Sequence, residues 1–251
     1  MMYIYNRLRD IYTNKGFVGV LKGLYRFIKF GVRERPSYIR YSAFRNKTKN
    51  RIRGFQPVPD PLAETEIPPH DITDCCDAFE KYGHEGAIRD GRWDQRRTPL
   101  TETTKYRGIQ QRYVEGYDWE DTAIFEEFTQ LIESGDQKDG VNTYDRLVER
   151  YEQIDRLYES IKTNGVLRRA DRPDASGVYD DILLNIGGDG ELLFNGNGWH
   201  RLCIAKILDL DSIPVRIYVR HSDWQRVRER VSNGDNPSGV ALTHPDLQAI
   251  I

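Results

Sequence analysis

The run Asn195-Gly196-Asn197-Gly198-Trp199-His200-Arg201-Leu202-Cys203-Ile204-Ala205-Lys206 decides the fold, because two glycines lead directly into a predicted helix. The first turn of that helix carries His200 and Arg201. The N–H groups and the positive dipole at a helix N-terminus attract anions, and Gly198 lets the backbone approach a bound phosphate. The run therefore predicts a phosphate-binding site. The alternative is an ordinary glycine turn before a helix.

The segments on either side of this run have clear hydrophobic periodicity. Upstream, apolar residues at helical spacing between positions 154 and 161 predict a helix that ends at an Asn164-Gly165 C-cap. Downstream, alternation over residues 213–220 predicts a strand. The apolar face of this strand is expected to hold Ile213, Val215, Ile217 and Val219.

A hairpin is predicted between that helix and the glycine-rich run. Residues 181–186 and 191–194 are strand-like, and Gly187-Gly188-Asp189-Gly190 separates them. This turn lacks the Gly-Lys-Ser/Thr ending of a phosphate loop, so we interpret it as a plain hairpin turn.

Taken in order, the helix, the hairpin, the Gly-x-His-Arg-Leu helix and the Ile-Pro-Val strand resemble the ParB/sulfiredoxin superfamily over residues 154–221. The stretch from Glu64 to Ile72 is similar to the first strand of the same fold. The resemblance therefore begins near residue 62 and is interrupted by an insert over residues 75–145. It implies an α+β fold, with a ParB/sulfiredoxin-like domain over residues 57–231 that carries a helical insert.

Three chemistries of this superfamily differ at the start of the motif helix. Sulfiredoxins place a reactive cysteine before His-Arg, where this chain has Trp199, so the resemblance does not imply sulfinic-acid reduction. Partition-type ParB proteins carry Gly-Glu-Arg-Arg, and the glutamate that participates in CTP hydrolysis is missing here. ADP-dependent free serine kinases carry Asp-Gly-His-His-Arg. This chain matches that frame in three of five positions, with Asn197 in place of the aspartate proposed as base.

The kinase-like branch is closest in motif, so the resemblance implies an ATP- or ADP-dependent phosphotransferase that uses Mg²⁺ and acts on a small or membrane-associated polar acceptor. Because an amide at position 197 cannot accept the proton, the candidate bases are Glu66 and Asp94. The alternative is a non-enzymatic, DNA-associated module whose anion site holds a backbone phosphate. The predicted nucleotide-binding residues are Asn197, Gly198, Trp199, His200 and Arg201.

Aromatic and acidic residues gather in the insert. Arg112, Trp119 and Glu120 are predicted to line a pocket for a polar, ring-bearing substrate, and neighbouring carboxylates could position Mg²⁺. The alternative is that Trp119-Glu120-Asp121-Thr122 simply starts a helix, with acidic residues in its first turn.

The basic N-terminal arm covers residues 1–56. Its first 54 residues hold fourteen lysines and arginines against two acidic residues, a net charge of +12 in a chain whose total is −2. Within the arm, residues 15–33 place cations on one helical face and apolar residues on the other, as in a helix that lies on an anionic membrane. The alternatives are a helix packed on the main domain and a segment that binds the nucleic-acid backbone. We interpret residues 34–61, rich in arginine and proline, as a connector.

The remaining composition excludes several classes of protein. Three cysteines, two of them adjacent, form neither a disulfide framework nor a metal-ligand spacing, and the histidines are too scattered to predict a metal site. We therefore expect a reducing, cytoplasmic compartment, with peripheral attachment to the inner membrane face through the arm. The glycine- and asparagine-rich residues 232–251 are predicted to form a flexible tail.

Overall fold

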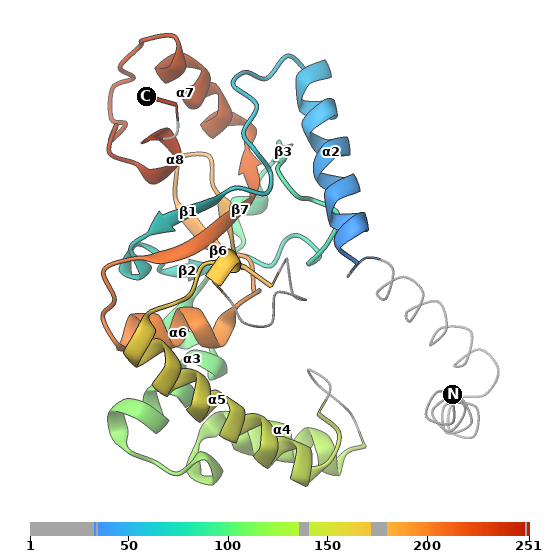
Figure 1. Ribbon diagram of the computed structural model, residues 1–251, viewed down its shortest axis with the longest axis vertical. Helices are drawn as coiled ribbons and strands as arrows, with labels where there is room; N and C mark the ends of the chain where they lie inside the picture. Colours follow the sequence, from blue (N-terminus) through green and yellow to red (C-terminus); the bar gives the residue numbers. More distant parts are fainter. Residues whose placement is uncertain (1–32, 34, 136–140, 172–179, 249) are drawn as a thin grey trace, which may run out of the picture.

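The computed structural model describes residues 33, 35–135, 141–171, 180–248 and 250–251, and shows a mixed α+β protein (Figure 1). Seven strands in these ranges form one open sheet in the order β1-β7-β5-β6-β2-β4, and β3 pairs with the far half of β7. The strands are β1 (Glu64–Ile67), β2 (Asp74–Cys75), β3 (Ala87–Arg89), β4 (Thr98–Pro99), β5 (Ile182–Ile186), β6 (Leu192–Phe194) and β7 (Ile213–His221).

The centre of the sheet consists of β5 and β7, which run parallel with Ile182 opposite Val215. The predicted hairpin is confirmed, because β5 and β6 pair antiparallel across the Gly187–Gly190 turn. The predicted strand at 213–220 is also present as β7. The expected alternation is incomplete, because all nine residues of β7 are buried, including Arg216 and Arg220. Both faces of this strand are therefore covered by other parts of the chain.

Helices cover the sheet and build a second layer below it in Figure 1. The predicted end of the long helix at Asn164 is confirmed, with Gly165 in a positive-φ conformation as its C-cap. The helices are α2 (Pro36–Ile52), α3 (Thr104–Gln110), α4 (Ala123–Glu133), α5 (Tyr144–Asn164), α6 (Trp199–Ile207), α7 (Ser222–Ser232) and α8 (Pro245–Gln248).

Two large hydrophobic clusters meet at α6. One cluster joins the sheet to α6, α7 and α8, and takes Leu202 and Ala205 from α6. The other lies among α3, α4, α5 and α6, and takes Cys203 and Ile204. Because four consecutive residues of α6 are fully buried, this helix is fixed on both sides and its N-terminus has a defined position.

The insert over residues 75–145 is only partly the helical addition that we predicted. Its second half forms α3 and α4, which pack in the helical layer. Its first half contributes to the sheet, because β3 pairs with β7, and Cys75 of β2 pairs with both β4 and β6. Short strands of two or three residues have too little periodicity to be found from sequence.

The connector predicted over residues 34–61 is largely a helix. Helix α2 packs against β3, and its buried face carries Asn46 and Asn50 rather than a strong apolar stripe. The amide of Asn50 donates to Gly86 O at 2.8 Å, and that of Asn46 donates to Glu85 O at 3.1 Å. These side chains replace the hydrophobic signal that would have predicted the helix. Residues 15–32 of the segment predicted to lie on a membrane are outside the described part of the chain.

The C-terminal segment is packed, which corrects the predicted flexible tail. Leu247 of α8 is fully buried in the cluster that covers the sheet, and Asp246 pairs with Arg220 and Arg228. In the described part of the chain, no helix combines the length and the apolar character that crossing a membrane requires.

Candidate functional site

The N-terminus of α6 is built against the first residue of β5. After β6, the chain stays beside β5, because Asn195 N donates to Leu183 O at 2.9 Å and Leu183 N donates to Asn197 O at 3.2 Å. Gly198 then caps α6 in the left-handed region, with φ at +92°. Having no side chain, Gly198 provides no capping hydrogen bond to the first turn of the helix. The site predicted from the sequence is therefore a helix N-terminus whose first turn receives no side-chain cap.

Two of the five predicted nucleotide-binding side chains serve the fold. Asn197 is buried, and its amide donates to the backbone oxygen of Asp181, so it joins the α6 loop to β5. Trp199 packs edge-on against Phe194, with ring centroids 4.7 Å apart. The Lys105 ammonium lies 5.9 Å from the Trp199 ring centroid. The Asn197 amide and the Trp199 ring therefore both have partners within the protein.

Arg201 and His200 lie in the first turn of α6, as predicted. The guanidinium of Arg201 pairs with Asp180, with Nη2 at 3.1 Å from Oδ2, and it also donates to the backbone oxygen of Asp180. The Arg201 side chain is largely buried, whereas that of Asp180 is 63% exposed. His200 is half-buried. The helix terminus therefore carries one cation and one solvent-facing carboxylate.

Behind this pair lies an ionic network that the sequence did not reveal. Asp181 is buried between Arg169, at 2.7 Å, and Arg216, at 2.9 Å. Glu64 accepts from Arg169 N at 3.0 Å. When Arg201 and Asp180 are included, the network holds three arginines and three carboxylates, so its formal charge is zero. The α6 dipole is thus one source of positive potential that these side chains leave uncompensated. The feature of the sequence that could have indicated this network is the Asp180-Asp181 pair directly before a strand-like run.

The two predicted bases lie away from the α6 terminus. Gly198 lies against Ile182, the first residue of β5. Asp94 lies beyond the other end of this strand, where it accepts from Gly188 N at 2.8 Å. The length of β5 therefore separates Asp94 from Gly198 by roughly 13 Å or more. Glu66 alternates with Ile67 and so points to the sheet face opposite α6, where it pairs with Arg168 at 2.7 Å. The structure brings neither carboxylate to the α6 terminus. The carboxylate that lies there is that of Asp180.

Two of the three predicted substrate residues, Arg112 and Trp119, make contacts within the helical layer. Trp119 is 6% exposed and belongs to the helical core, and its Nε1 donates to Asp155 at 3.0 Å. Arg112 and Tyr113 bind the same carboxylate, at 3.2 and 2.8 Å. Burial and the hydrogen bond to Asp155 both raise the pKa of Tyr113, which keeps its hydroxyl a donor. Asp155 is therefore a structural node.

Glu120 is exposed outside this node, in the short 3₁₀ turn Trp119–Asp121 that precedes α4. Helix α4 begins at Ala123, and Thr122 caps it by accepting from Phe125 N. The alternative interpretation of this segment as a helix start is the one that the structure confirms.

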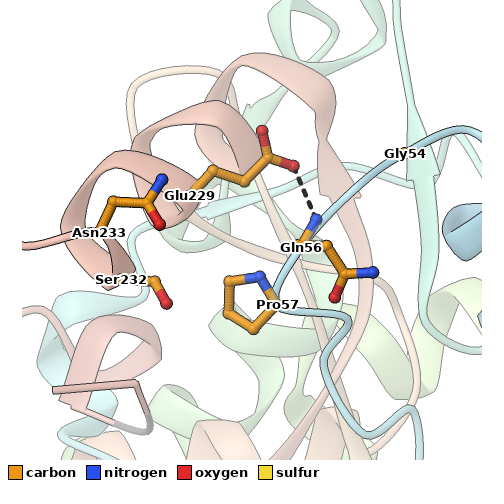
Figure 2. Close-up of a pocket in the computed structure, with 6 residues that line it drawn as sticks. All are labelled: Gly54, Gln56, Pro57, Glu229, Ser232 and Asn233. Carbon is orange, nitrogen blue, oxygen red and sulfur yellow. Dashed lines mark hydrogen bonds between the residues drawn. The ribbon is translucent and has the colours of Figure 1, made fainter.

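A pocket of about 410 Å³ lies between residues 54–57 and the C-terminal end of α7 (Figure 2). Glu229 accepts from Gln56 N at 3.0 Å across it, and its lining includes Ser232 and Asn233 but no cation. The C-terminal end of a helix carries negative partial charge. This pocket is therefore poorly suited to a phosphate, and the α6 terminus remains the better candidate.

Among the described residues, no cluster of three or more histidines, cysteines, aspartates or glutamates could hold a metal ion. Magnesium in nucleotide sites needs only one or two carboxylates, because phosphates and water supply its other ligands. The exposed carboxylate of Asp180 fits that requirement at the α6 terminus.

No family model, curated protein or solved structure matches the chain. The resemblance to the ParB/sulfiredoxin superfamily thus stays a prediction that rests on the quoted residues.

Proposed function

We propose that the chain binds the phosphates of a nucleotide, ATP or ADP with Mg²⁺, at the N-terminus of α6. The observation that carries the proposal is the pairing of Arg201 with Asp180 directly beside the left-handed cap Gly198. A phosphate placed there would accept hydrogen bonds from backbone N–H groups and from a guanidinium, which is a favourable arrangement for an anion.

The contact between Arg201 and Asp180 allows exchange for a ligand. Only the Asp180 side of this pair is exposed, and there water screens the carboxylate and lowers the free energy needed to separate it from Arg201. A phosphate carries more charge than one carboxylate and adds backbone hydrogen bonds, so it can compete for Arg201. Displaced Asp180 would then be close enough to hold Mg²⁺ or to accept a proton.

We further propose that the bound nucleotide donates a phosphoryl group to a small or membrane-associated polar acceptor, with Asp180 in the role first assigned to Glu66 and Asp94. Phosphoryl transfer depends mainly on positioning and charge neutralisation, which a helix terminus, an arginine and Mg²⁺ can supply. Release of labelled phosphate or a labelled product from ATP or ADP would distinguish turnover from binding alone.

Replacing Arg201 with alanine is expected to weaken nucleotide binding about tenfold or more, because a charge-assisted hydrogen bond contributes roughly 1.5–3 kcal/mol. Isothermal titration calorimetry with ATP and ADP, with and without Mg²⁺, measures the change.

The matched control is Arg168→Ala, which removes an arginine that is 57% exposed and paired with Glu66 on the other face of the sheet. Equal affinity of the Arg201 variant and the wild type would refute the site. Binding of duplex DNA with a steep salt dependence, without nucleotide binding, would instead support the DNA-associated alternative.

A further inference from the structure

Helix α2 has an outer face whose charge is of one sign. The helix contains five basic residues and no acidic residue over its 17 positions. Figure 1 places it at the periphery of the molecule, beside β3. Such a helix attracts an anionic surface. Its five cations are Arg40, Arg45, Lys47, Lys49 and Arg51.

Large apolar side chains project from the same outer face. Tyr41 is 58% exposed, Phe44 is 70% exposed and Ile52 is 80% exposed. Their spacing of three and then eight residues keeps them in one stripe of an α-helix. Arg40, Lys47 and Arg51 flank this stripe along one side by the same periodicity. Solvent-exposed phenylalanine and isoleucine in one stripe indicate a surface that contacts a partner or a membrane when the protein functions.

The opposite face fixes the helix to the protein. Ile39 and Ala43 are buried, and Asn46 and Asn50 donate to backbone oxygens of the loop before β3. Arg45 Nη2 donates to Gly83 O at 2.7 Å and strengthens this attachment. The outer stripe is therefore presented by a helix that is already folded, so binding through it does not require the ordering of the chain.

We propose that α2 docks on an anionic lipid bilayer, with its axis in the membrane plane. Its apolar stripe of Tyr41, Phe44 and Ile52 would lie in the interface, and the flanking cations Arg40, Lys47 and Arg51 would lie among the headgroups. This arrangement is that of an interfacial amphipathic helix. A helix of 17 residues is about 25 Å long, long enough for all three apolar side chains to touch one surface.

The apolar stripe favours lipid over nucleic acid. Interfaces with nucleic acid are polar and strongly basic, and their aromatic side chains stack on bases. Phe44 could stack in this way, but the aliphatic side chain of Ile52 could not. Burial of both side chains in the acyl boundary explains the pair together.

The test uses the full chain and sedimentation with vesicles of phosphatidylglycerol and phosphatidylcholine in equal parts. The double variant Phe44→Ser/Ile52→Ser is expected to lower the vesicle partition coefficient about tenfold or more, because two large apolar side chains lose their burial. The charge variant Lys47→Glu/Arg51→Glu is expected to lower it as well. Wild-type binding should weaken with salt and fall on pure phosphatidylcholine.

The matched control is Val114→Ser/Tyr117→Ser, which removes exposed apolar residues from the segment between α3 and α4. This control should bind vesicles as the wild type does, and circular dichroism should show all three double variants folded. Equal binding of the Phe44/Ile52 variant and the wild type, or no binding by the wild type, would overturn the proposal. Tight duplex DNA binding that survives the Phe44/Ile52 change and is lost in the charge variant would assign α2 to nucleic acid instead.

Discussion

Replacing Asp246 with alanine is expected to lower the free energy of unfolding by about 3–5 kcal/mol, because it leaves two buried guanidinium groups without their shared carboxylate. Arg220 Nη2 lies 2.6 Å from Asp246 Oδ1, and Arg228 Nη1 lies 2.8 Å from Oδ2. Trp224 Nε1 also donates to Asp246, at 2.9 Å. All three partners are nearly fully buried, so water cannot replace the lost contacts.

The same carboxylate gives a definite dependence on pH. Burial alone would raise the pKa of Asp246, but Arg220, Arg228 and the hydrogen bond from Trp224 lower it to about 2. The pKa of an unfolded aspartate is about 3.9. The stability contributed by Asp246 is therefore present above that value and is lost as the pH falls toward 2. The depressed pKa corresponds to about 2 kcal/mol.

Urea denaturation between pH 7 and pH 2 measures both effects. The control is Asp235→Asn, which removes one partner of an exposed pair with Arg230 and should cost less than about 1 kcal/mol. A loss in the Asp246 variant no larger than in this control would show that the C-terminal cluster does not support the fold.

Replacing Gly198 with alanine is expected to cost about 2–5 kcal/mol and to weaken phosphate binding at the same time. A Cβ atom there would lie 2.8 Å from Ile182 Cγ1 and 3.0 Å from Ile182 Cα, which belongs to the backbone of β5. Overpacking of this kind typically costs about 1–3 kcal/mol, and the left-handed conformation adds about 1–2 kcal/mol for a residue with a side chain. Moving the cap away from β5 also shifts the helix terminus that would bind the ligand.

Gly116 provides the matched comparison for this variant. It has φ at +79°, and a Cβ atom there would have no neighbour within 4 Å. Gly116→Ala should therefore cost only the conformational part, about 1–2 kcal/mol. Thermal or urea unfolding of both variants separates the close contact from the backbone strain. Equal losses of unfolding free energy in Gly198→Ala and Gly116→Ala would mean that α6 can shift on β5 without an energetic penalty.

Elements with strong local signals could be predicted from the sequence. The hairpin of β5 and β6, the end of α5 at Asn164 and the start of α6 after Gly198 all follow from glycine positions and apolar periodicity. The predicted phosphate site at α6 depended on the same local features, and its backbone geometry was predictable for that reason.

Features that depend on distant partners were missed. The buried face of α2 contains Asn46 and Asn50, whose acceptors lie 36 to 39 residues further along the chain. The C-terminal segment looked loose because the partners of Asp246, Arg220 and Arg228, precede it by 18 to 26 residues. Such polar contacts have no period in the sequence, so no local pattern reveals them.

The misplaced site residues have the same cause. Trp119 and Arg112 have the composition of a binding pocket, but both are bound to Asp155, which lies on a different helix. Which carboxylate reaches the α6 terminus depends on strand pairing and on the face to which each side chain points. A single sequence does not determine either for Glu66 and Asp94.

Because α6 supplies side chains to both hydrophobic clusters, the sheet and the helical layer share one element. Opening of either layer removes side chains that pack against α6 and so loosens the position of Gly198. A ligand that binds only the intact terminus therefore adds its binding free energy to both layers at once, by mass action on the folded state. If α6 binds phosphate as proposed, the stability of the helical layer would be linked to ligand concentration through this nine-residue helix.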